Sequence, residues 1–201
     1  MDRLYRRGLR LEYFTVAYNV VEAFVSILFG KVAHSIALVG FGLDSIVESL
    51  AGLVLIWRLS QHKKVSKQEE EKIEYRARIL VAVTFFILGL YVLFQSVKKL
   101  IFREIPEPSL PGIIIAVLSM IVMPVLTVQK YKTGLQLKSK AMIADSKETL
   151  ACAFLSVALL LGLGMNYWFG FWQADPVVGI IIVIFLFMEG REGLRDLREE
   201  G

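Results

Sequence analysis

Cysteine and histidine are nearly absent from this chain of 201 residues. Cys152 is its only cysteine, and His34 and His62 are its only histidines. A single cysteine excludes an internal disulfide. Both histidines lie outside the long apolar stretches, so no imidazole is available there as a base. A membrane enzyme is therefore the weakest functional hypothesis, since no nucleophile and base pair is visible either.

The sequence also has no segment left over for a separate soluble domain. Its mean hydropathy is +0.59 and 56% of its residues are hydrophobic, well above an ordinary soluble domain. The apolar residues form blocks of about 20, the length with which a helix crosses roughly 30 Å of hydrocarbon. We predict an all-α membrane protein, one six-helix transmembrane domain over residues 1–201, with spans at about 12–30, 35–57, 79–101, 111–129, 141–172 and 174–190.

The start of the fifth span is ambiguous. If the helix enters the lipid near Ala141, Cys152 lies about 16 Å deep at 1.5 Å per residue. If it enters only at Leu150, Glu148 lies at the cytoplasmic mouth instead. In the second span, Asp44 lies about 13 Å from the outer end at Ser35, close to the middle of the bilayer.

Basic residues are scarce on one side of the predicted bundle. Nineteen of the 23 Lys and Arg residues lie in the N-terminal arm, between spans two and three, between the end of span four and Leu150, or in the tail. The positive-inside rule then predicts cytoplasmic termini and a multi-pass protein of the cell membrane. Residues 61–74 are almost wholly polar, so we expect a cytoplasmic loop there with a helical turn or two. Charges so close to the membrane argue against a nucleic-acid partner. The first apolar run carries Glu22 and lacks a cleavage motif, so we expect no cleaved signal peptide.

Acidic side chains inside the apolar stretches are the most unusual feature of the sequence. Each costs about 3 kcal/mol at mid-bilayer, so their presence predicts a function. In the first span, polar residues at helical spacing share one face that should look into the bundle; they are Thr15, Asn19, Glu22 and Ser26. In the second span, Asp44 and Glu48 lie one turn apart. No Lys or Arg is expected at comparable depth to pair with them.

The fifth span adds a second pair of candidate ligands. Glu148 and Cys152 share a helical face with Ala141, Asp145 and Ser156. Pairs spaced four residues apart on two helices can assemble four ligands around one metal ion. Lone acids in membrane helices also serve proton relays or bind organic cations, so the pattern alone leaves these functions open.

Two stretches of the sequence resemble a known family of membrane proteins. Residues 34–59, HSIALVGFGLDSIVESLAGLVLIWRL, resemble the second transmembrane helix of the cation diffusion facilitator (cation efflux) family, in which an acid or histidine is followed four positions later by an acid. Residues 143–185 resemble its fifth and sixth helices, where members of the family have the pattern A-D-x-x-H-x-x-x-D. The resemblance implies a six-helix homodimer that exports divalent cations, usually zinc, in exchange for protons.

The resemblance implies a metal site made of Asp44, Glu48, Glu148 and Cys152. Glu148 stands where the family usually has histidine, and Cys152 where it has the final aspartate. Carboxylates favour harder ions such as manganese, while a thiolate favours zinc, cadmium or cobalt. We expect zinc first, as a substrate and not a cofactor, then cadmium or cobalt, with manganese and ferrous iron as competitors. The chain ends soon after the sixth span, so we expect the short branch of the family, without its C-terminal cytoplasmic domain.

Proton coupling and two other functions follow from the same residues. Buried carboxylates and thiols tend to hold protons, and metals bind deprotonated ligands, so protons and metal should exchange at one site. We expect Glu22 beside this site or on a proton path. The alternatives are a proton-coupled exporter of organic cations that uses Glu22, and a membrane metal-binding subunit that transports nothing. Asp175 is expected to be structural, as the cap of the sixth span.

Overall fold

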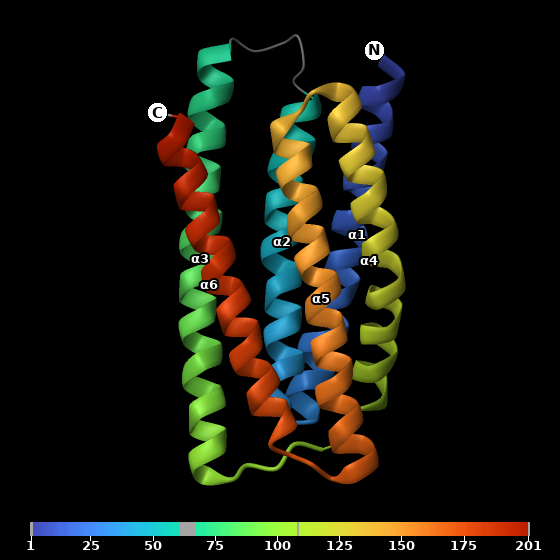
Figure 1. The fold of residues 1–201 in the computed structure, drawn as a ribbon, viewed down its shortest axis with the longest axis vertical. Helices are drawn as coiled ribbons and strands as arrows, with labels where there is room; N and C mark the ends of the chain where they lie inside the picture. The colour runs from blue at the N-terminus through green and yellow to red at the C-terminus, as the bar shows by residue number, and fades with distance from the viewer. Residues whose placement is uncertain (1, 61–66, 108, 201) are drawn as a thin grey trace.

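A computed structural model describes residues 2–60, 67–107 and 109–200 of the chain. In these ranges the chain forms six α-helices and no strand: α1 (Asp2–Val32), α2 (Ile36–Ser60), α3 (Lys67–Phe102), α4 (Leu110–Leu137), α5 (Lys140–Phe169) and α6 (Ala174–Glu200). The helices run along one long axis, and the first and last helices begin and end at the same end of the bundle (Figure 1). The predicted all-α, six-helix plan is confirmed.

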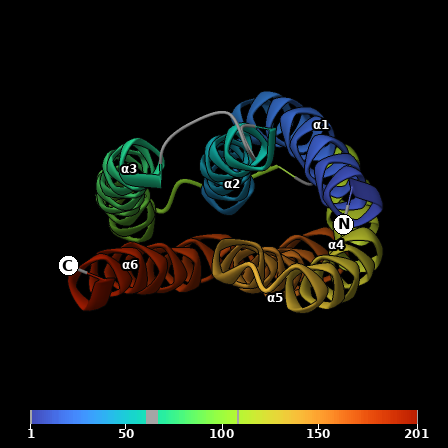
Figure 2. The ribbon, with the colours of Figure 1, turned by 90° about the horizontal axis from the view of Figure 1, so that it is seen from above.

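The helices are arranged as two layers of three (Figure 2). One layer holds α3, α2 and α1, and the other holds α6, α5 and α4, so that each helix contacts a partner across the layers. α2 and α5 are the middle helices of their layers. Each of them therefore has one face toward α3 and α6 and another toward α1 and α4.

The composition of the helices fits a membrane bundle. α1 to α5 each contain an apolar segment long enough to cross a membrane. In α6 the apolar run is shorter, because Asp175 and Glu189 bracket it. The outward faces carry exposed aromatic side chains such as Phe24 and Phe94, both 68% exposed, which suit lipid better than water.

Several helices are longer than their predicted spans. α3 begins at Lys67, which fits the helical turn or two expected within the polar segment 61–74; residues 61–66 of that segment lie outside the described residues. α4 continues to Leu137, which places Lys130 in a helix and not between helices. α5 begins at Lys140, where the hydroxyl of Ser139 accepts a hydrogen bond from the Met142 backbone N–H at 3.3 Å. The helix of the fifth span therefore includes Glu148, while the point at which it enters the lipid stays a prediction.

Close backbone approach holds α1 and α2 together. A Cβ atom on Gly42 would lie 2.8 Å from Cγ1 of Ile27 and 2.9 Å from Cβ of Ser26, so only glycine fits there. The polar stripe predicted for α1 is confirmed as a buried face, with Thr15, Asn19, Glu22 and Ser26 each at most 1% exposed.

Asp175 has a structural role, but not the predicted one. It lies in the first turn of α6 and accepts a hydrogen bond from the backbone N–H of Ile36 at 3.0 Å and another from the Ser35 hydroxyl. It also pairs with the ammonium of Lys99 at 2.8 Å, and that ammonium donates to the carbonyl of His34. Asp175 therefore caps α2 and joins it to α3 and α6, so the prediction that it caps its own helix is wrong.

Candidate metal site

Three of the four predicted ligands line one cavity between the two layers. Asp44 and Glu48 come from α2, where they are 8% and 4% exposed, and Glu148 comes from α5. Glu189 of α6 adds a fourth carboxylate. The cavity contains about 290 Å³ of unfilled space, counted to its open mouth, and its remaining walls are apolar: Phe85, Ala151, Leu155 and Phe185. Four carboxylates from three helices thus surround one small space with an apolar wall.

Glu148 lies well inside α5. The helix begins at Lys140, so Glu148 is about 12 Å along the axis from its first residue at 1.5 Å per residue. The favourable effect of a helix N-terminus on an acid falls off within the first turn. The helix N-terminus therefore does not stabilise an acid at this position. Glu148 instead lines the cavity together with the three other carboxylates.

Cys152 does not line the cavity, although it lies one turn after Glu148 on α5. Its side chain is 1% exposed, and its Sγ lies 3.9 Å from Oε2 of Glu22, a residue of α1. The thiol also interacts with the carboxylate of Glu48, which lines the cavity. The structure thus brings Asp44, Glu48 and Glu148 together around the cavity and places Cys152 next to Glu48 and Glu22.

The acids form a cavity and not a closed coordination shell. In residues 2–60, 67–107 and 109–200, no three side chains of His, Cys, Asp or Glu are arranged closely enough to hold a metal ion. Oε2 of Glu48 has no hydrogen-bond partner in this part of the chain, although it is buried. A buried, unpaired carboxylate oxygen is costly unless something binds it. A bound cation or a proton would satisfy this oxygen.

Glu22 lies on the other side of α2, among hydroxyl groups. It is fully buried and accepts hydrogen bonds from the hydroxyl of Ser45 at 2.8 Å and from that of Ser119. The hydroxyl groups of Tyr18 and Ser119 are also hydrogen-bonded, at 2.8 Å. Glu22 is thus held beside Cys152 and does not line the cavity.

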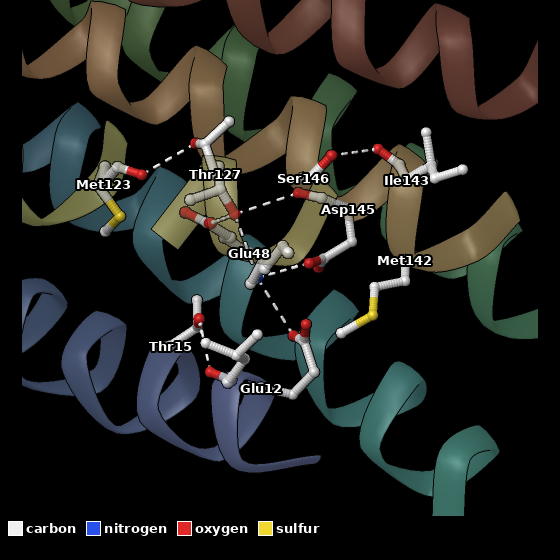
Figure 3. A network of polar contacts seen from close by, with 12 residues as sticks. Glu12, Thr15, Glu48, Met123, Thr127, Met142, Ile143, Asp145 and Ser146 are labelled. Carbon is white, nitrogen blue, oxygen red and sulfur yellow. Dashed lines mark hydrogen bonds and ion pairs between the residues drawn. The ribbon is translucent and has the colours of Figure 1, made fainter. Parts of the chain in front are cut away.

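A buried lysine lies close to these acids, but its described ion pairs are with Asp145 and Glu12 and not with Asp44 or Glu48. Lys130 of α4 is 0% exposed and pairs with Asp145 Oδ2 at 2.5 Å and with Glu12 Oε2 at 3.2 Å. It also donates to the hydroxyl of Thr149 at 3.2 Å, and Thr149 in turn donates to Oε1 of Glu48 at 2.8 Å. Figure 3 shows Glu12, Asp145 and Glu48 converging on this network from three helices.

Comparison with known proteins agrees with this architecture. Residues 13–199, which include part or all of each of the six helices, match the cation efflux transmembrane domain. The chain belongs to the cation efflux family. It is a multi-pass membrane protein, as predicted, and the family that the two sequence stretches resemble is confirmed.

The chain is similar along most of its length to three known proteins. It is 23% identical over 193 residues to Transmembrane protein 163 of Xenopus laevis, covering 96% of this chain and 68% of that protein. It is 26% identical over 179 residues to an uncharacterized transporter of Methanocaldococcus jannaschii, covering 86% and 62%. It is 21% identical over 191 residues to the manganese efflux system protein MneS of Bacillus subtilis, covering 90% and 65%. The chain thus spans about two thirds of the lengths of these relatives.

Several residues around the cavity are not indicated by sequence patterns. Glu189 is the acid that closes the apolar run of the sixth span, and this position is its only signal. Lys130 precedes Lys132 and further lysines, a pattern typical of a basic segment between two spans. Glu12 and Thr149 carry no signal in the sequence, because their importance comes from the helices beside them.

Proposed function

We propose that this protein transports divalent transition-metal cations across the membrane, and that the cavity between α2, α5 and α6 is its cation site. The observation that carries the proposal is the gathering of Asp44, Glu48 and Glu148 around one cavity inside a membrane bundle. Acids at this depth are unfavourable unless they pair or bind a cation. Glu189, at the same cavity, extends the site toward the end of the bundle that holds the termini.

Manganese is our first candidate among the ions. The four carboxylates of the cavity offer only oxygen donors, which suit a harder ion better than zinc. The efflux of manganese by the relative from Bacillus subtilis supports the same choice. The zinc expectation depends on Cys152, whose thiol would have to turn from Glu22 toward the cavity to become a fourth ligand.

The transport cycle that we propose is exchange of one metal ion for protons by alternating access. Carboxylates in an empty, buried site favour the protonated form, and a metal ion must displace those protons to bind. Glu22 would serve the proton path, since it is buried beside Cys152 without lining the cavity. We further propose that the protein works as a homodimer in the cell membrane with both termini in the cytoplasm, and that it exports its substrate.

The test is ion uptake by proteoliposomes that contain the purified protein, measured for manganese, zinc, cadmium, cobalt and ferrous ions. We expect uptake of manganese, and at least a tenfold lower rate for Asp44→Asn, which keeps the size of the side chain and removes its charge. Glu104→Gln is the control, because Glu104 is half exposed and pairs only with Lys98 among described contacts. Equal rates for Asp44→Asn and the wild type would overturn the proposed site.

Two further readings of the same assay separate the alternatives. An internal pH dye reports protons, and metal uptake without opposing proton movement would exclude exchange. Saturable metal binding without flux would indicate a metal-binding subunit. An exporter of organic cations would lose its activity in Glu22→Gln; against this alternative, Glu22 is fully buried and its carboxylate is hydrogen-bonded to Ser45 and Ser119.

A further inference from the structure

Lys130 is a fully buried cation, and each of its three N–H donors has a partner. Its ammonium contacts Oδ2 of Asp145 at 2.5 Å, Oε2 of Glu12 at 3.2 Å and the hydroxyl of Thr149 at 3.2 Å. Burying an ammonium is unfavourable unless carboxylates and further hydrogen bonds compensate it. The hydroxyl of Thr149 completes this set and is its one neutral member.

The hydroxyl of Thr149 connects the lysine to the proposed cation site. An ammonium group only donates hydrogen bonds, so the Thr149 oxygen must accept from Lys130. Its single proton is then free for one acceptor. Oε1 of Glu48 lies at 2.8 Å and the backbone carbonyl of Asp145 at 3.1 Å, and a carboxylate is the stronger acceptor. The direction of the chain is therefore Lys130 to Thr149 to Glu48.

This chain of bonds fixes one oxygen of Glu48 and leaves the other without a partner. Oε1 is held by Thr149, while Oε2 has no hydrogen bond to any described residue. Glu48 also lines the cavity with Asp44 and Glu148. Carboxylates that bind metals are usually held in this way by a neighbour, and loss of that neighbour weakens metal binding by roughly 10- to 100-fold.

We infer that Lys130 and Thr149 are positioning residues for the cation site: the ammonium orients the Thr149 hydroxyl, which holds Oε1 of Glu48 so that Oε2 remains for the metal ion. This inference rests on the proposed function, because it assigns Glu48 a cation ligand role. Glu12 and Asp145 hold the ammonium in place from α1 and α5. The cation site on one side of α2 and α5 is thereby connected to the helices on the other side.

Thr149→Val tests the inference without disturbing the ion pairs. Valine keeps the branched shape and removes the hydroxyl, while Lys130 retains both of its carboxylates. Thr149→Ser returns the hydroxyl and should rescue the effect. Thr133→Val is the matched control, because Thr133 is equally buried but its hydroxyl bonds only to the carbonyl of Gln129 in its own helix, at 2.8 Å.

The measurement is the dissociation constant of Mn²⁺, and separately of Zn²⁺, for the purified full chain in detergent by titration calorimetry, together with the unfolding temperature. We expect Thr149→Val to raise the constant roughly 10- to 100-fold, and Thr149→Ser and Thr133→Val to stay within about threefold of the wild type. Thr149→Ser and Thr133→Val should unfold at temperatures similar to that of the wild type. Thr149→Val should unfold at a somewhat lower temperature, because an N–H of Lys130 and Oε1 of Glu48 lose a buried partner, but a purely structural threonine would not weaken metal binding in protein that is still folded.

Three outcomes overturn the inference, and they are distinguishable. If Thr149→Val binds both ions as the wild type does while Asp44→Asn binds them poorly, the positioning role is wrong and the cation site stands. If the wild type binds neither ion, the proposed function fails and the positioning role fails with it. A weakening by Thr149→Val that Thr149→Ser does not reverse would likewise contradict the role of the hydroxyl.

Discussion

Replacing Lys99 by methionine should destabilise the bundle far more than the same change at the neighbouring lysine. Lys99 is 3% exposed and its ammonium pairs with Asp175 at 2.8 Å, at the end of the bundle opposite the termini. Methionine keeps much of the apolar stem and removes the charge. Asp175 would then remain buried, with only the hydroxyl of Ser35 and the backbone N–H of Ile36 as donors.

The size of the effect follows from this geometry. Breaking a buried ion pair by removing one partner costs about 3–5 kcal/mol, and the two remaining donors favour the lower end, about 3 kcal/mol. For a chain of about 200 residues each kcal/mol shifts the unfolding temperature by roughly 2–4 °C, so Lys99→Met should lower it by about 6–12 °C. Lys98 pairs with Glu104 at 3.0 Å but is 43% exposed, and such pairs contribute about 0–1 kcal/mol.

The assay is thermal unfolding of the detergent-solubilised protein, followed by intrinsic tryptophan fluorescence. Lys98→Met is the control, and the double variant Lys99→Met with Asp175→Asn completes a cycle. Because replacing both partners of a buried pair is often nearly neutral, the double variant should unfold at a higher temperature than Lys99→Met alone. The reasoning is refuted if Lys99→Met and Lys98→Met unfold at the same temperature, or if the double variant is less stable than both single variants.

Three further substitutions test other parts of the structure. Gly42→Ala should lower stability by about 1–3 kcal/mol, because its Cβ would lie 2.8 Å from Ile27. Gly40→Ala, whose Cβ would meet only side chains at 3.3 Å or more, should cost less in the same unfolding assay. Glu22→Gln should slow manganese uptake without abolishing it, since the amide oxygen still accepts hydrogen bonds; complete loss in the vesicle assay would make Glu22 essential. Cys152→Ser should leave manganese uptake within about threefold and lower zinc uptake more, because only zinc gains from a thiolate; equal losses for both ions would contradict this.

The helices and the buried face of α1 could be predicted because they depend on local patterns. Blocks of apolar residues set the helix count, and the spacing of Thr15, Asn19, Glu22 and Ser26 set a face that the structure buries. Ser109 lies just before Pro111, a pattern typical of a helix start, and it caps α4, where its hydroxyl accepts a hydrogen bond from the Gly112 backbone N–H at 3.2 Å. Each of these features involves residues within one or two turns of one another, so the sequence carries the whole signal.

The pairing of charges could not be predicted, because it depends on which helices are neighbours. The sequence places Lys130 between two predicted spans. In the structure α4 continues to Leu137, and Lys130 pairs with residues of α1 and α5. Asp175 looked like a cap for its own helix, although its partners lie in α2 and α3. Nothing within a single segment distinguishes these roles, since the deciding contacts join residues more than 70 positions apart or on separate helices.

The separation of Glu148 and Cys152 has a geometric cause that also bears on the choice of metal. Residues four apart on an α-helix are displaced by about 40° around its axis, because each residue advances about 100°. On a helix with one neighbour both side chains would face the same way. α5 is a middle helix between two pairs of neighbours, so the same displacement turns Glu148 toward the cavity with Glu189 and Cys152 toward Glu22. Glu48 lines the cavity and also interacts with the Cys152 thiol, so an ion that binds between Asp44 and Glu148 would lie closer to carboxylate oxygens than to the sulfur.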